Sequence, residues 1–191
     1  MFIPRIIFGF HGCDERIVRM VLEGGTLRPS TNAWDWLGHG IYFWEDSPAA
    51  RALLWAHEMS RLPGSAVKNP SVLGAIIDLG HCLNLTDPAG GVLVKAAYDE
   101  HLRQGQEFGI PAAVNKGADS KARFLDCAVM NLLHELRADL ELPAFDTVRG
   151  FFIEGQPLYP TAGLRSLDHV QVCVRHPHSI VGFFRPNPAR R

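Results

Sequence analysis

The stretch "WLGHGIYFWED", residues 36–46, combines two features that a single strand does not normally need. Residues 41–43 are β-branched or aromatic, which is typical of a buried strand. Gly38 and Gly40 stand directly before them, although glycine weakens a strand unless something approaches its backbone closely. We therefore expect this segment to be a strand that forms the floor of a ligand pocket.

Composition limits the classes of protein to consider. The chain has 191 residues, of which 47% are hydrophobic, so residues 1–191 can form a single domain with its own core. A net charge of -1 provides no overall basic field that would attract nucleic acid. The four cysteines are far apart and form no Cys-x-x-Cys pair, which favours reduced thiols and a cytoplasmic protein. The sequence shows neither a signal-peptide pattern nor a window as long as a membrane span.

The order of apolar segments and breakers predicts alternating strands and helices. We expect strands at residues 5–10, 40–45, 73–80, 148–155, 169–175 and 179–185. We expect helices from a cap at Asp14 to residue 22, after Ser47-Pro48, over 91–104, and from Asp119 or Ser120 to Leu142. Residues 105–120 read as a long irregular stretch. This order favours an α+β fold in which helices flank a largely antiparallel, split β-sheet.

Three short motifs follow one another along the chain: "FHG" at 10–12, "GHGIYF" at 38–43 and "HVQVCV" at 169–174. With the helices between them, they resemble the ADP-ribosyltransferase superfamily, in the branch with a His-Tyr-Glu triad. That branch includes the diphtheria-toxin-like and poly(ADP-ribose) polymerase catalytic domains. The second and third motifs are also similar to small bacterial members, some of which are thought to be toxins.

The resemblance implies a function and its partners. It implies an ADP-ribosyltransferase-like catalytic domain that uses NAD as a co-substrate and no metal. The enzyme would transfer one ADP-ribose to a macromolecular acceptor, either protein or nucleic acid. For a toxin of this kind, an antitoxin protein is a candidate partner.

The resemblance also implies roles for particular residues. His11 would hydrogen-bond the adenosine ribose, and the backbone of Gly12 would hold the nicotinamide amide. Tyr42 would lie against the nicotinamide ring, and Gly40 would let the backbone turn beside the cofactor. Ser30 lies in the loop where this superfamily holds the diphosphate and ribose.

One position departs from the family pattern. Gln171 stands where the catalytic Glu is expected, and it would hold the 2′-OH of the nicotinamide ribose. Its amide oxygen can accept a hydrogen bond but carries no charge, so we expect weaker stabilisation of a cationic transition state. His169 lies two residues earlier on the same face and could supply a base towards the acceptor. Glu154 and Arg165, around the preceding loop, are candidates for contact with the acceptor.

A second departure concerns the other side of the nicotinamide. The polymerase branch uses a Tyr from the helix that follows the second motif, and this helix contains none. Trp44 or Trp55 could take its place. Arg28, in the loop with Ser30, could equally be a solvated loop residue.

Each of these residues also has a purely structural interpretation. His11 and Tyr42 could be core residues, and Gln171 could be an ordinary strand residue. Cys13 beside His11 suggests a thiol nucleophile, but no third group is evident. Residues 176–178, His-Pro-His, fit a turn better than a metal site. The alternative function is a catalytically silent domain of the same fold that binds a nucleotide or a macromolecule.

Overall fold

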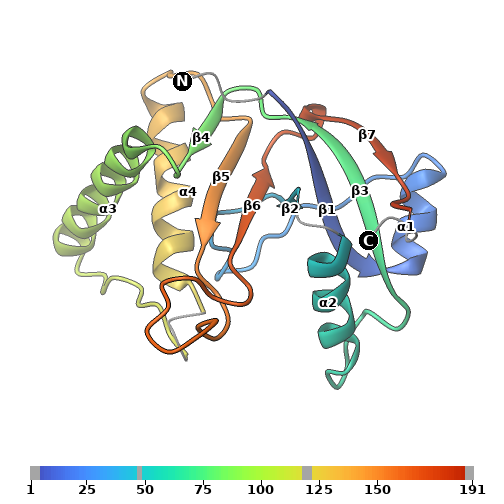
Figure 1. The fold of residues 1–191 in the computed structure, drawn as a ribbon. Helices are drawn as coiled ribbons and strands as arrows, with labels where there is room; N and C mark the ends of the chain where they lie inside the picture. The colour runs from blue at the N-terminus through green and yellow to red at the C-terminus, as the bar shows by residue number, and fades with distance from the viewer. Residues whose placement is uncertain (1–4, 47–48, 118–121, 188–191) are drawn as a thin grey trace.

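The computed structural model describes residues 5–46, 49–117 and 122–187. Its strands are β1 (Ile6–Asp14), β2 (Ile41–Glu45), β3 (Pro70–Asp78), β4 (Cys82–Asn84), β5 (Thr147–Phe152), β6 (His169–Val174) and β7 (Ile180–Phe184). Its helices are α1 (Glu15–Leu22), α2 (Ala49–Ser60), α3 (Pro88–Phe108) and α4 (Phe124–Asp139). The strands form one sheet in the order β4-β5-β6-β2-β1-β3-β7, antiparallel except between β4 and β5 (Figure 1). The predicted α+β class with a largely antiparallel sheet is confirmed.

Some predicted boundaries were wrong. The short strand β4 was not predicted, because a segment of three residues that pairs in parallel with β5 carries no periodic signal. The helix expected over 91–104 is longer at both ends. Asp87 caps α3, Pro88 occupies its first turn, and Gly109, with φ of 65°, ends it.

Other boundaries agree or lie outside the described residues. Asp14 caps α1 as predicted, since its side chain accepts a hydrogen bond from the N–H of Arg16. The caps expected at Ser47 and at Asp119 or Ser120 lie outside the described residues. In the described part α4 begins at Phe124 and ends at Asp139, slightly before the predicted end.

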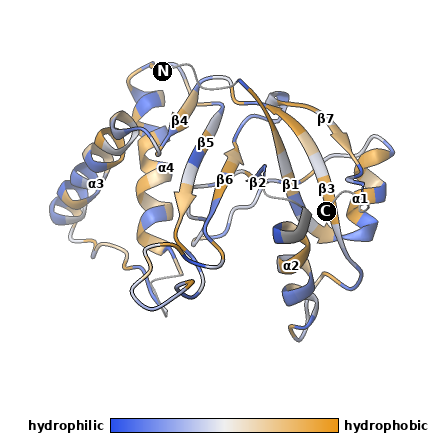
Figure 2. Ribbon diagram, viewed as in Figure 1, coloured by the Kyte–Doolittle hydropathy of each residue, from blue (hydrophilic) through white to orange (hydrophobic). Residues whose placement is uncertain are grey.

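Helices cover both faces of the sheet, as the alternation of side chains along β2 shows. Phe43 belongs to the core cluster that includes α1. Tyr42 faces the other way and packs against the cluster that includes α3 and α4, while Trp44, on the same face, shares a cluster with α2. Hydrophobic residues concentrate along the central strands and on α4, and hydrophilic ones on the outermost helix α3 (Figure 2). Thus α2 and the α3–α4 pair stand on the same face, over different parts of the sheet.

The strand β1 is shared unequally between its two neighbours. It pairs with β3 along its whole length. With β2, the pairs among the described residues are Gly9 with Glu45 and Phe10 with Trp44. Beyond Phe10 the two strands separate, so the sheet opens beside His11.

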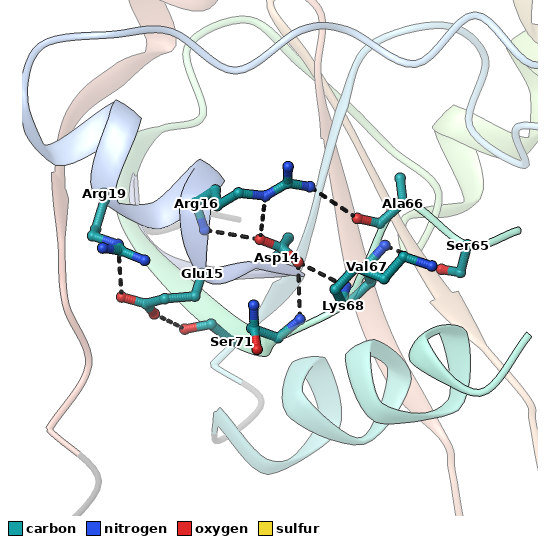
Figure 3. A network of polar contacts seen from close by, with 10 residues as sticks. Asp14, Glu15, Arg16, Arg19, Ser65, Ala66, Val67, Lys68 and Ser71 are labelled. Carbon is teal, nitrogen blue, oxygen red and sulfur yellow. Dashed lines mark hydrogen bonds and ion pairs between the residues drawn. The ribbon is translucent and has the colours of Figure 1, made fainter.

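A polar network fixes the corner where β1 turns into α1 (Figure 3). The Asp14 carboxylate, which is 3% exposed, accepts hydrogen bonds from the backbone N–H groups of Arg16, Lys68 and Asn69 at 2.7–3.0 Å. The Nε of Arg16 donates a further bond. One carboxylate therefore ties the end of β1 and the start of α1 to the segment that leads into β3, and it anchors the chain two residues after Gly12.

Replacing Asp14 with Asn should make folding stability less dependent on acid. Hydrogen bonds from the N–H groups of Asn69, Arg16 and Lys68 lower the pKa of Asp14 well below its ordinary value. A depressed pKa contributes stability above the unfolded pKa of about 3.9, and the contribution is lost as the pH falls through the folded pKa. In urea unfolding, the wild type should therefore have a higher free energy of unfolding than Asp14→Asn at pH 7. This difference should narrow towards pH 3. Asp99→Asn, at an exposed ion pair on α3, is the control and should change little; an equal Asp14→Asn gap at both pH values would contradict the prediction.

Candidate functional site

A cleft of about 390 Å³ opens on the face of the sheet that carries α2. Residues from both ends of the chain line it. The predicted site residues among them are His11, Gly12, Ser30, Gly40, Tyr42, Glu154 and Gln171. The order of the strands explains this, because β6 lies beside β2 and β2 lies beside β1.

His11 lies where β1 separates from β2. Its Nδ1 is 2.9 Å from the carbonyl oxygen of Tyr42. A carbonyl can only accept, so Nδ1 carries the proton and donates it. Burial lowers the pKa of His11, which keeps the ring neutral and leaves Nε2 as a hydrogen-bond acceptor. The side chain thus links the two strands and offers an acceptor atom at the cleft.

Tyr42 lines the cleft, and its hydroxyl is hydrogen-bonded within the fold. The hydroxyl donates to the carbonyl oxygen of Gly38 at 2.7 Å and accepts from the N–H of Leu37 at 2.9 Å. Burial raises the pKa of Tyr42 far above its ordinary value, so the phenol stays neutral. The hydroxyl is therefore committed to the preceding turn, and the ring is held as a fixed apolar surface.

The glycines of this region are explained by close packing and by one turn. The turn is at Gly38, whose φ is +78°, and not at Gly40, where the resemblance had implied it. A Cβ on Gly40 would lie 2.4 Å from the Sγ of Cys173, so glycine lets β2 approach β6. A Cβ on Gly12 would lie 2.3 Å from the carbonyl oxygen of Ala52, so α2 packs directly on β1. Both glycines still line the cleft.

All four tryptophans of the chain line the cleft: Trp34, Trp36, Trp44 and Trp55. Trp44 and Trp55, which were candidates for a second stacking surface, lie with ring centroids 6.0 Å apart. Trp34 and Trp36 were not predicted, because they belong to an irregular loop without periodicity. The four tryptophans together give the cleft flat aromatic surfaces of the kind that bind ring systems.

Gln171 occupies the centre of the sheet beside the cleft. In the strand register it lies opposite Trp44 of β2 and opposite Gly150 of β5. Directly opposite residues of antiparallel strands share a face. The amide of Gln171 and the ring of Trp44 therefore stand side by side on the cleft face.

An ion pair that the sequence did not reveal spans the cleft. Nη2 of Arg51, on α2, lies 2.6 Å from Oε2 of Glu154, just after β5. Both side chains are largely buried, 11% and 17% exposed, and the guanidinium lies 5.4 Å from the ring of Trp44. Arg51 was missed because its partner is 103 residues away. The pair connects α2 to the segment between β5 and β6.

His169 and Arg165 do not line the described cleft. His169 is buried beneath it, against the rings of Phe152, Trp36 and Trp44. Its Nδ1 donates to the carbonyl oxygen of Leu167 at 2.7 Å, and burial lowers its pKa.

Arg165 belongs to the loop that follows Glu154. Its Nη1 lies 3.4 Å from the carbonyl oxygen of Gly155. The carboxylate of Asp168 accepts from the N–H groups of Glu154 and Arg165 at 3.0 and 2.8 Å, which closes the base of this loop.

A polar turn forms one wall of the cleft. The carboxylate of Asp35 accepts from the Ser30 hydroxyl at 3.1 Å and from the Asn32 N–H at 2.9 Å. Ser30 also pairs with Gly40 through reciprocal backbone hydrogen bonds. A second cavity, of about 420 Å³, adjoins this wall and shares His11 and Arg28 with the cleft. The two cavities therefore meet at His11 and Arg28.

Two other hypotheses receive no support from the geometry. Burial raises the pKa of Cys13 to about 12, so it is a thiol and a poor nucleophile at neutral pH. Residues 177–179 form a short 3₁₀ turn between β6 and β7. Within residues 5–46, 49–117 and 122–187, no group of three or more His, Cys, Asp or Glu residues is arranged to hold a metal ion.

One stretch of the chain is similar to a known protein. No family model matches the chain, and no solved structure matches it. The chain is similar to an uncharacterized protein of Methanocaldococcus jannaschii, with 32% identity over 66 residues. That match covers 35% of this chain and 30% of the archaeal protein. In the described part of the chain, every helix is too short or too polar to cross a membrane.

Removing the hydroxyl of Tyr42 should destabilise the fold. Tyr42→Phe leaves the N–H of Leu37 without its partner and weakens the bonding of the Gly38 carbonyl. Loss of a buried hydrogen-bond partner costs about 1–3 kcal/mol, measurable as a lower free energy of unfolding in urea. Tyr159→Phe, at a residue that is 60% exposed, is the matched control and should change stability by less than about 0.5 kcal/mol. Equal effects of the two substitutions would contradict the structural role of the Tyr42 hydroxyl.

Proposed function

We propose that this protein is an NAD-dependent mono-ADP-ribosyltransferase. It would cleave the bond between nicotinamide and ribose in NAD and transfer ADP-ribose to a macromolecular acceptor. One observation carries this proposal: a single cleft gathers His11, Tyr42 and Gln171 from three separate strands. These are the residues that the three motifs suggested as a triad.

The chemistry of the cleft fits NAD. The fixed ring of Tyr42, with Trp44 and Trp55 nearby, suits the flat nicotinamide ring. The neutral Nε2 of His11 suits a ribose hydroxyl, which can donate to it. The adjoining cavity, reached past His11 and Arg28, suits the adenosine half of a dinucleotide.

The reaction needs stabilisation of positive charge on a sugar. NAD supplies a ribose whose bond to nicotinamide breaks with the electron pair moving to the ring nitrogen, as in other glycosidic cleavages. The amide oxygen of Gln171 would accept a hydrogen bond from the 2′-OH and orient the ribose. Tryptophan rings line the cleft, and polar contacts beside apolar rings are stronger than the same contacts in open water.

The acceptor and the biological setting are part of the same proposal. We place the reaction in the cytoplasm of a bacterium, on a protein or nucleic-acid acceptor, as a toxin or defence activity controlled by an antitoxin protein. The motif resemblance to small bacterial toxin-like members supports this setting. Labelled NAD added to a cell lysate, with the products divided by protease and nuclease digestion, identifies the class of acceptor.

A second candidate function is a catalytically silent nucleotide-binding module. Gln171 favours it, because an amide stands where a carboxylate would aid the reaction. One assay, nicotinamide release from bound NAD, distinguishes the two functions. A silent module binds NAD without releasing nicotinamide, whereas a transferase releases it.

NAD should bind the cleft and quench the intrinsic fluorescence. Because all four tryptophans line the cleft, a bound nicotinamide lies beside the emitting rings. His11→Ala should weaken NAD binding about tenfold, equivalent to the loss of one good hydrogen bond. His57→Ala, on the exposed side of α2, is the control and should bind like wild type. Unchanged wild-type fluorescence and no calorimetric heat at millimolar NAD would remove the basis of the proposal.

Truncating Gln171 should slow the reaction more than it weakens binding. Gln171→Ala removes the acceptor for the 2′-OH, and one oriented hydrogen bond in a closed site is worth roughly a hundredfold in rate. Nicotinamide release measures the rate, and fluorescence quenching measures NAD binding. Gln106→Ala, on the surface of α3, is the matched control. Nicotinamide release at the wild-type rate in Gln171→Ala would exclude Gln171 from the triad.

A further inference from the structure

The cleft contains a carboxylate that could replace the missing one at position 171. Among the described residues, the carboxylates that line the cleft are Asp35 and Glu154. Asp35 is used within its own turn, where it accepts from Ser30 and from the N–H of Asn32. Glu154 is instead held across the cleft by α2, through Arg51.

We propose that Glu154 is the general base that activates the acceptor, while Gln171 orients the ribose. This inference rests on the proposed function and names the residue that supplies its negative charge. Oε2 of Glu154 lies 3.6 Å from Nδ1 of His169, and His169 precedes Gln171 by two residues on β6. Two residues of an extended strand span about 6.6–6.8 Å. The carboxylate of Glu154 and the amide of Gln171 thus belong to neighbouring positions of one cleft.

The step balances without any further reactant. The bond between C1′ of the ribose and the nicotinamide nitrogen breaks, and its electron pair leaves with neutral nicotinamide. A lone pair on an O–H or N–H acceptor forms the new bond to C1′. The acceptor's proton passes to the carboxylate of Glu154 and then to water. With water as the acceptor, the products are ADP-ribose, nicotinamide and a proton.

The neighbours of Glu154 are Arg51, which orients its carboxylate, and His169, which is the other candidate for the general base. Arg51 donates to Oε2 from Nη2 and is itself held 5.4 Å from the ring of Trp44, so the carboxylate has a fixed orientation. His169 is a weaker candidate for the base. Its Nδ1 donates to the carbonyl oxygen of Leu167, and its Nε2 is buried without a hydrogen-bond partner among the described residues. An acceptor entering the cleft meets Glu154, whereas His169 is covered by aromatic rings.

Glu154→Gln tests this assignment, since it removes the charge and keeps the shape. We expect nicotinamide release to fall roughly 10²–10⁴-fold, the usual contribution of a general base. NAD binding, measured by tryptophan fluorescence, should stay within about threefold of wild type. Glu45→Gln is the matched control, because Glu45 forms an equally buried ion pair with Arg149 outside the cleft. This control should retain wild-type nicotinamide release.

A second substitution separates catalysis from structural support. Adding Gln171→Glu to Glu154→Gln returns one carboxylate to the cleft from β6, and we expect at least a tenfold recovery of nicotinamide release. A loss of nicotinamide release without recovery in the double variant would overturn the proposal. Glu154→Gln with wild-type activity would also overturn it and leave the proposed function intact. A wild-type protein that neither binds NAD nor releases nicotinamide would overturn both.

Discussion

The architecture of the cleft depends on one constraint: β1 separates from β2 beyond Phe10, whereas it stays with β3 along its whole length. Where two strands separate, backbone groups lose their ladder partners, and buried groups must find others. His11 meets this need by donating from Nδ1 to the carbonyl oxygen of Tyr42. The same bond sets the tautomer of the ring and leaves Nε2 as an acceptor. The separation of the strands therefore explains the hydrogen bond of His11, and that hydrogen bond sets which ring nitrogen can accept at the cleft.

The ion pair between Arg51 and Glu154 is better understood as a positional device than as a source of stability. Burying two charges is costly, and the attraction between them often does no more than offset that cost. The pair joins α2 to the segment after β5, two parts of the chain that approach the cleft from different sides. Burial of both side chains and the ring of Trp44 beside Arg51 lower the local dielectric, so the orientation of each charge matters more than it would in water.

The sequence predicted the class of fold, and its short motifs contain several of the residues that line the cleft, because both rest on local patterns. His11, Gly12, Tyr42 and Gln171 all lie in short motifs at strand positions. The sequence did not predict the ion pair of Arg51 with Glu154. An arginine on a helix has the same local pattern whether it is solvated or paired with a residue far away in the sequence. The sequence also could not show which glycine forms the turn and which allows close packing. A positive φ, as at Gly38, and a close approach of strands, as at Gly40, both favour glycine.

The amide at position 171 is electrostatically consistent with a carboxylate at position 154. Carboxylates at both positions of the same cleft would repel each other, which would raise the pKa of one of them. The cleft holds one guanidinium close to this pair of positions, from Arg51, which can balance a single negative charge. An amide at Gln171 accepts a hydrogen bond from a ribose hydroxyl without adding a second charge. If the proposed function holds, the arrangement divides between two residues the orientation and the proton transfer that one glutamate would otherwise combine.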